Sequence, residues 1–228
     1  MAKTPAERRD ELKSLFEGDT HVYIDYANVR NCCKRLGWEI DFCKLKSLLD
    51  STGKVKSARF YFGTIAGDKG SQGFMARVRK EGFDVETKPV KFMDLSIDVS
   101  SVGVQSTTIL QSFIDQTLIR SLKVESIEYL NLQLAELNKQ GISSLSKRKC
   151  NFDVEIATDM RLDHALGKAQ TYCLWSGDSD FAHPMFQLLN DSRKVIVISK
   201  GVATEINDLK SYGLIYHDIR KLKDLICR

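Results

Sequence analysis

The stretch Thr171–Asp180, which reads TYCLWSGDSD, decides the fold of this chain. Its first five residues are β-branched, aromatic or apolar, a composition typical of a buried strand. The strand leads directly into a short loop that carries Asp178 and Asp180. A second compact run, His21–Asp25 (HVYID), also ends in a carboxylate. If these two strands are neighbours in a parallel sheet, they predict an acidic site at its carboxyl edge.

Strand and helix patterns alternate along the rest of the chain. Val195–Ser199 (VIVIS) is fully apolar, as expected for a central parallel strand. Phe83–Val90 is a further strand pattern, and Pro89 predicts an edge position for its end. The glycines of Gly63–Gly73 predict a loop before a helix that starts at Phe74. The alternation favours an α/β fold, PIN-like or Rossmann-like, with a mostly parallel sheet and helices on both faces.

The predicted organisation is one core domain with two additions. Residues 1–19 form a charged helical extension, 20–93 and 147–228 form the catalytic domain, and 94–146 form a helical insertion. The insertion carries an apolar stripe at spacings of three and four, made of Ile127, Leu130, Leu134 and Leu137. Such a stripe must be buried somewhere. We expect a homodimer through the insertion, with folding back onto the sheet as the alternative.

Composition narrows the class of protein. The chain has 228 residues with a formal net charge of +4, which permits nucleic-acid binding without requiring it. It contains no run of roughly 18 apolar residues, so no membrane span is expected. Its charged N-terminus does not resemble a signal peptide. The six cysteines lack C-x-x-C spacing, which indicates reduced thiols in a cytoplasmic protein rather than zinc or disulfides.

Asp153, at the start of a predicted helix Asp153–Leu166, adds a fourth carboxylate to the expected site. A lone aspartate there would be explained equally well as a helix cap. Clustered carboxylates repel one another and are stable mainly when a divalent cation neutralises them. Oxygen ligands fit Mg²⁺ or Mn²⁺ better than zinc. A site of this kind can activate water and stabilise phosphoryl oxygens.

Four ordered segments resemble the motif series of the NYN domain family, PIN-like nucleases also grouped under the LabA name. The segments are IDYAN (24–28), KCNFDV (149–154), TDM (158–160) and WSGDSDF (175–181). The resemblance implies that the catalytic residues are Asp25, Asn28, Asp153, Asp178 and Asp180. It implies that the four aspartates hold Mg²⁺ or Mn²⁺. Asp159 matches a further recurrent acid of the family, and Ser176 is expected to support the site through loop hydrogen bonds.

The chain departs from the family pattern at three places. Tyr26 stands where the family usually has glycine, and its ring either narrows the mouth of the site or points into the core. Cys150-Asn151 replaces a glycine-containing approach to the helix that starts at Asp153. Ser192 stands where glycine often precedes the basic residue before the last core strand.

The predicted function is a metal-dependent ribonuclease with RNA as its partner. Five basic residues flank the insertion and are expected to contact RNA phosphates: Lys88, Lys91, Lys147, Arg148 and Lys149. One alternative is a regulatory module that binds nucleic acid or metal on the same fold without turnover. Another is a phosphatase or phosphotransferase, which the lack of a D-x-D motif after the first strand disfavours.

Overall fold

The structure, a computed structural model, describes residues 3–228 and divides into two compact units. The first, here called the sheet unit, comprises the chain up to Pro89 together with Asn151–Arg228. The second, here called the inserted unit, is Val90–Cys150. The boundary lies four residues outside each end of the predicted insertion of 94–146. Met1 and Ala2, which belong to the predicted N-terminal extension, lie outside the described residues.

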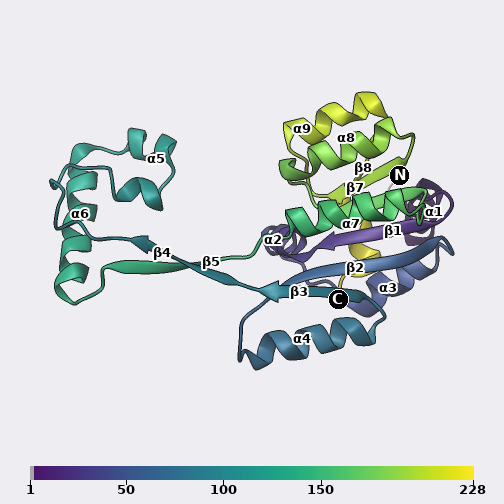
Figure 1. Cartoon of the computed structure of the whole chain (residues 1–228), viewed down its shortest axis with the longest axis horizontal. Helices are drawn as coiled ribbons and strands as arrows, with labels where there is room; N and C mark the ends of the chain where they lie inside the picture. Colours follow the sequence, from purple (N-terminus) through teal and green to yellow (C-terminus); the bar gives the residue numbers. More distant parts are fainter. Residues whose placement is uncertain (1–2) are drawn as a thin grey trace. The chain divides into compact units, whose positions relative to one another are not determined.

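The sheet unit is built on six parallel strands (Figure 1). They are β1 (Thr20–Asp25), β2 (Val55–Thr64), β3 (Asp84–Pro89), β6 (Thr171–Trp175), β7 (Lys194–Ser199) and β8 (Ile215–Asp218). Their order is β3-β2-β1-β6-β7-β8. This confirms the edge position predicted from Pro89 and the interior position predicted for VIVIS. β1 and β6 are entirely buried, because helices cover the sheet on both faces.

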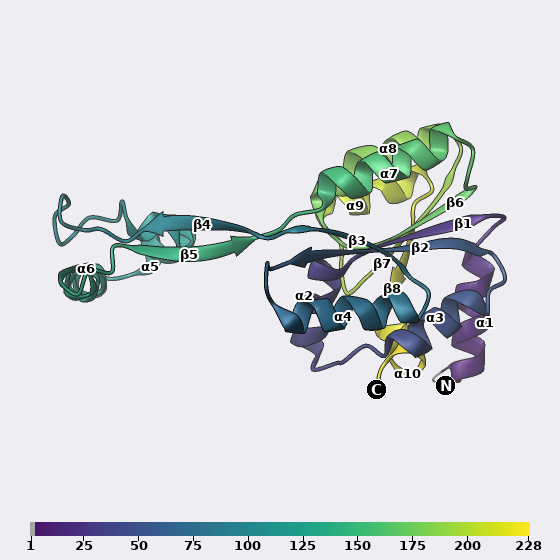
Figure 2. The same ribbon diagram turned by 60° about the horizontal axis from the view of Figure 1, so that its bottom comes forward.

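Helices lie on both faces of the sheet, as the strand–helix alternation predicted. Figure 2 shows α7, α8 and α9 on one face and α1, α2, α3, α4 and α10 on the other. Their bounds are α1 (Pro5–Leu15), α2 (Tyr26–Leu36), α3 (Phe42–Asp50), α4 (Lys69–Lys80), α7 (Asp153–Ala165), α8 (Ala182–Asn190), α9 (Thr204–Asp208) and α10 (Lys223–Ile226), with 3₁₀ turns η2 (Ser179–Phe181), η3 (Leu209–Tyr212) and η4 (Ile219–Leu222). Among residues 3–228, none of the helices has the length and apolar character needed to cross a membrane.

The strand order reverses between β1 and β6. From β1 the chain continues outward through β2 and β3, whereas the later strands β6, β7 and β8 extend the other way. In an open parallel sheet, ligands bind beyond the carboxyl ends of the strands at such a reversal. Asp25 ends β1, and Ser176 directly follows β6. The topology therefore places the predicted acidic residues at the position where this class of sheet forms its sites.

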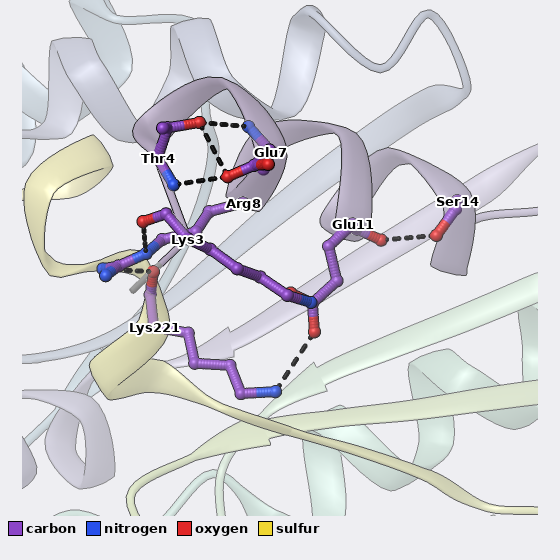
Figure 3. A network of polar contacts seen from close by, with 7 residues as sticks. All are labelled: Lys3, Thr4, Glu7, Arg8, Glu11, Ser14 and Lys221. Atoms are coloured by element: carbon purple, nitrogen blue, oxygen red, sulfur yellow. Dashed lines mark hydrogen bonds and ion pairs between the residues drawn. The ribbon is translucent and has the colours of Figure 1, made fainter. Parts of the chain in front are cut away.

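Helix α1 is fixed to the sheet unit by both packing and polar contacts (Figure 3). Thr4 and Glu7 form a reciprocal capping box at its start. The side chain of Leu12 is fully buried. Arg8 donates a hydrogen bond to the carbonyl of Lys221 at 3.3 Å. Helix α1, which the sequence predicted as a charged extension, is therefore packed against the rest of the sheet unit.

An aromatic cluster fills the space between the sheet and the α2, α3 and α4 helices. Tyr26 belongs to it, with ring-centroid distances of 4.8 Å to Phe60 and 5.0 Å to Phe74. Phe42 closes the cluster at 5.5 Å from both phenylalanine rings. The tyrosine that replaces the usual glycine therefore points into the core rather than into the mouth of the acidic site.

The inserted unit contains the predicted helices, and the structure adds two strands at its ends. Its elements are β4 (Lys91–Ser96), η1 (Leu110–Ser112), α5 (Gln116–Ser121), α6 (Val124–Lys139) and β5 (Ser144–Lys149). β4 and β5 pair as an antiparallel ribbon, here called the basic ribbon. All six residues of β5 are exposed, so the strand has no buried face for a sequence pattern to reveal.

The apolar stripe of α6 is covered inside the inserted unit itself. Ile127 is buried in a small core with Leu110 and Ile119, and Leu130 and Leu134 pack against that core. Neither a second copy nor the central sheet is needed to cover these side chains. The stripe therefore no longer supports the homodimer, because η1 and α5 supply the apolar surface that the prediction assigned to a partner.

The start of α4 differs from the sequence prediction, and the backbone at Ser192 explains a departure from the family pattern. α4 starts at Lys69, with Asp68 as its cap, so Gly70 and Gly73 are helical rather than part of a loop. Ser192 has a φ of 57°, in the left-handed region. It is the residue that stands where glycine is usual, so the turn before β7 keeps a conformation that glycine would adopt without strain.

Replacement of Leu12 by alanine tests the docking of α1. We expect Leu12→Ala to lower the free energy of unfolding by about 2–5 kcal/mol, because a fully buried leucine leaves a cavity. Urea denaturation of the full chain measures this change. The matched control is Lys13→Ala, an exposed neighbour on the same helix, expected within about 0.5 kcal/mol of the parent. Equal effects of the two substitutions would contradict the docked position of α1.

Candidate acidic active site

Asp25 is the buried member of the candidate site, with 8% of its surface exposed. It ends β1 and caps α2, accepting a hydrogen bond from the backbone N–H of Asn28 at 3.2 Å. Its second oxygen accepts a hydrogen bond from the hydroxyl of Ser176, also at 3.2 Å. The parallel register pairs Ile24 with Trp175, so this contact follows from strand pairing alone. Ser176 is thus in contact with Asp25, and its supporting role stays a prediction.

Asp178 and Asp180 lie in the loop after β6. The N–H of Asp178 donates to the Ser176 hydroxyl at 3.4 Å, and Asp178 caps η2 by accepting from the N–H of Asp180. Gly177 allows the loop to bend tightly, since a Cβ there would meet the carbonyl oxygen of Gly201 at 2.2 Å. The loop is thus held by its own hydrogen bonds and by a close backbone approach that only glycine permits.

Asp153 reaches the same site from the first turn of α7. Its backbone N–H donates a hydrogen bond to Oδ1 of Asn151 at 2.8 Å, which helps to satisfy the free N–H groups at the helix start. Its carboxyl group lies near enough to Asp180, Asp178 and Asp25 for all three to raise its pKa. The structure therefore brings together the four aspartates predicted from the sequence, from three separate segments of the sheet unit.

The electrostatics of these acids show that their charges are not compensated. Burial, the largest cause, acts together with the contacts with Asp180, Asp178 and Asp25 to raise the pKa of Asp153 to about 6, against the opposing effect of Asn151. Burial also raises the pKa of Asp25, with Asp178 contributing, although its hydrogen bonds act in the opposite direction. Carboxyl groups that retain protons in this way form a site that favours a cation.

Asp163, on the same helix as Asp153, provides a contrast. It is 2% exposed, and burial alone would raise its pKa. Hydrogen bonds from His21, Tyr23 and Arg59, at 2.8, 2.8 and 3.1 Å, instead hold the pKa below its usual range. Asp163 is therefore a compensated structural acid, whereas the corresponding partners are missing around Asp153. This lack of compensating partners distinguishes the candidate site from an ordinary cluster of buried polar residues.

Asp159 lies in the polar layer between α7 and the sheet. Its carboxylate accepts a hydrogen bond from the hydroxyl of Tyr61 at 2.7 Å and lies 3.7 Å from Arg59. These partners belong to β2 rather than to the loops that carry the four aspartates. Asp159 thus orients α7 on the sheet, and any support it gives to Asp153 passes through the helix.

The donor chemistry of the site fits a hard divalent cation. All four side chains offer carboxylate oxygens, the ligands that Mg²⁺ and Mn²⁺ prefer. Within residues 3–228, however, no three His, Cys, Asp or Glu side chains are already arranged as a metal-binding group. Repulsion between like charges keeps such carboxylates apart until a cation compensates them. The metal is therefore treated below as part of the proposal.

The five basic residues proposed for RNA contact fall into two groups. Lys88 belongs to the sheet unit, where it forms a 2.6 Å ion pair with Glu155 and lies 4.7 Å from the centroid of the Phe152 ring. The other four lie on the basic ribbon: Lys91, Lys147, Arg148 and Lys149. Lys91 pairs directly with Lys149, which confirms that the two ends of the insertion are adjacent.

The structure also places beside the site two residues of α2 that no sequence motif marked. Asn31 and Arg35 follow Asn28 at spacings of three and seven, so the three share one face of α2. They line a hollow together with Lys200. The helical spacing was readable in the sequence, but nothing in it indicated that this face meets the end of β7.

A six-stranded parallel sheet with acids at its topological reversal defines an α/β protein with a candidate acidic site at the carboxyl ends of its strands. The family model of the NYN domain matches residues 101–213. These residues are thus similar to the NYN domain, a PIN-like domain of nuclease type. The matched range includes Asp153, Asp178 and Asp180, whereas Asp25 lies outside it. The narrower LabA grouping stays a prediction.

Comparison with known proteins adds support for the fold. The chain is similar to a crystal structure of a protein of unknown function from Vibrio parahaemolyticus, with a TM-score of 0.56 and 16% sequence identity. The match covers 93% of this chain and 97% of that one. At this identity the likeness concerns the fold alone. None of the curated proteins matches the chain.

The pH dependence of stability tests the acidic cluster. The pKa of Asp153 rises from 3.8 to about 6 on folding, so the folded chain binds this proton more tightly than the unfolded chain. The resulting stabilisation is complete below pH 3.8 and is lost as the pH rises through about 6. With a chelator present, Asp153→Asn should remove this loss, and its Tm relative to the parent should increase toward neutral pH.

Thermal melts across this pH range provide the measurement. The matched control is Asp208→Asn, which removes an exposed acid at the end of α9. The Tm of the control should equal the Tm of the parent at every pH. If the Tm of Asp153→Asn also equals that of the parent throughout, the carboxyl group of Asp153 is not held in an uncompensated cluster.

Proposed function

We propose that this protein is a metal-dependent ribonuclease that hydrolyses phosphodiester bonds at the four-aspartate site. The observation that carries the proposal is the convergence of four aspartates at the reversal of the sheet, where burial first and the three neighbouring acids second raise the pKa of Asp153. A cluster of this kind is costly in the free protein and is stabilised by binding a cation. The NYN domain supports the assignment at the level of a nuclease-type hydrolase.

In this proposal Asp25, Asp153, Asp178 and Asp180 hold Mg²⁺ or Mn²⁺. When bound, the metal supplies activation of water and stabilisation of the charge that develops on the phosphate oxygens. Asp25 is pre-positioned for binding because the N–H of Asn28 and the hydroxyl of Ser176 fix its two oxygens. Asp153 must release its proton before it can act as a ligand, so metal affinity is expected to increase as the pH rises through about 6.

RNA is the proposed substrate, and the basic ribbon is the proposed contact surface of the inserted unit. Strand pairing places Lys91, Lys149, Met93 and Lys147 on one face, because Lys91 pairs with Lys149 and Met93 with Lys147. On the other face the guanidinium of Arg148 lies 5.9 Å from the ring centroid of Phe92. Positive charge for phosphates beside an exposed aromatic ring is the combination that single-stranded nucleic acid binds.

Two other functions on this fold would give different results in an RNA cleavage assay. A regulatory module without turnover would bind RNA or metal but leave RNA intact when Mg²⁺ or Mn²⁺ is added. A phosphatase or phosphotransferase would act on phosphomonoesters and would spare an RNA without a terminal phosphate. A cleavage assay on such RNA, with metal and with chelator, therefore separates the three classes.

Asp178→Asn tests the catalytic assignment. We expect metal-dependent RNA cleavage to fall by about a hundredfold or more, because even the partners of metal ligands contribute 10–100-fold. The fold should be retained, because asparagine can also cap η2 and because the substitution removes one charge from a repelling group. A cleavage assay and a thermal melt measure the two effects, with Asp208→Asn as the control. Full activity of Asp178→Asn would remove Asp178 from the site.

Replacing Lys147, Arg148 and Lys149 by alanine tests the basic ribbon. For single-stranded RNA, each lost phosphate contact should reduce the slope of log affinity against log salt by about 0.7. Binding is measured with a chelator present, so that cleavage does not interfere. The control is Arg9→Ala with Lys13→Ala, which removes exposed charges from α1. An unchanged slope in the ribbon variant would mean that these residues do not contact RNA.

A further inference from the structure

A polar hollow lies beside the acidic site, on the face of α2 that meets the end of β7. Here called the α2 groove, it is lined by Asn28, Asn31, Cys32, Arg35, Ser199, Lys200 and Gly201 and has a volume of about 460 Å³. The four residues from α2 follow helical spacing and form one stripe along the helix. From Asn28 to Arg35 this stripe extends about 10 Å along the axis.

The charge of the groove is opposite to that of the aspartate cluster. Arg35 and Lys200 contribute two cations, and no carboxylate lines the hollow. Within residues 3–228 neither cation has a salt-bridge partner, and both influence the thiol of Cys32. The acid that acts on the same thiol, Asp218, is already paired with Arg220 at 2.5 Å. The groove thus offers amide and cationic donors whose charge is not neutralised by the protein.

The groove is joined to the acidic site at both of its walls. On the α2 side, Asn28 lines the hollow while its backbone N–H binds Asp25. On the β7 side, Ser199 donates a hydrogen bond to the carbonyl of Gly201 at 2.6 Å, and that carbonyl lies against Gly177. The N–H of Ala203 also binds the carbonyl of Gly177 at 3.1 Å. Both walls are therefore anchored to the segments that carry Asp25 and Asp178.

We propose that the α2 groove binds a phosphodiester group of the RNA strand adjacent to the one that reaches the aspartates. The proposal rests on the proposed function and adds a positioning subsite to it. Arg35 and Lys200 would contact phosphate oxygens, with Asn31 as a further donor. The acidic site itself repels a polyanion, so cations a few residues away are needed to hold the strand in register. A continuous wall from Asn28 to Arg35 suits an extended strand better than an isolated anion.

Cys32 provides a direct readout, because its thiol lines the groove and is partly exposed. The probe is an oligouridylate of about ten nucleotides, a length within the range that single-strand sites cover. The full chain is treated with iodoacetamide in a chelator, with and without the probe, and labelling of Cys32 is followed by peptide mass spectrometry. We expect the probe to slow labelling of Cys32 but not of Cys43, which is exposed on α3.

Arg35→Gln and Lys200→Gln should each reduce this protection, whereas Arg35→Lys should retain part of it. The matched control is Lys34→Gln, which removes a charge from the same turn of α2 but lines a different hollow. Protection is compared as the ratio of labelling rates with and without probe, because the substitutions also change the reactivity of the thiol. Loss of protection in Arg35→Gln but not in Lys34→Gln supports the subsite.

Two results would overturn the proposal. Unchanged protection in both glutamine variants would mean that the strand does not enter the groove. Equal protection by inorganic phosphate at the same concentration would mean that the groove takes a free anion rather than a strand. The outcome is separate from catalysis, because labelling is measured without metal. Protection without RNA cleavage would support the subsite and reject the ribonuclease. Cleavage without protection would support the ribonuclease and reject the subsite.

Discussion

The parallel pairing of β1 with β6 is the constraint on which the rest of the site depends. It joins segments that are about 150 residues apart in the chain and places the end of one strand beside the end of the other. Asp25 and Ser176 meet only because of this register, and the loop carrying Asp178 starts from it. Because both strands are fully buried, a slip of one residue would move every side chain to the opposite face. The register is therefore strongly specified.

Much of the sheet unit follows from local sequence patterns. HVYID and VIVIS are recognisable as strands because they are short runs rich in β-branched, aromatic and apolar residues, and Pro89 identifies an edge because it has no N–H to donate. The four aspartates were also predictable, since Asp25 ends a strand, Asp153 starts a helix, and Asp178 with Asp180 lies in the loop that directly follows β6. What local patterns do not contain is the state of each charge. The contrast between Asp163, which has three partners, and Asp153, which lacks them, appears only when distant strands are in place.

The misjudged regions share a physical cause, because their local patterns do not identify a packing partner. The basic ribbon has strands without a buried face, so no alternation of apolar and polar residues marks it. The stripe of α6 correctly indicated a buried surface, yet the covering surface lies in a short irregular segment before the helix. In α4, Gly70 and Gly73 lower the local preference for a helix, but the cap at Asp68 and packing of the aromatic cluster maintain it.

The close approach of Gly177 to the carbonyl of Gly201 has an evolutionary consequence. Any side chain at position 177 would displace the backbone at position 201, so the loop of Asp178 and the wall that contains Lys200 cannot diverge independently. Relatives could change which side chains stand on either loop, but not the separation between the two loops. Side chains on α2 such as Asn31 and Arg35 carry no such constraint, because exchanging them leaves the backbone around the aspartates in place.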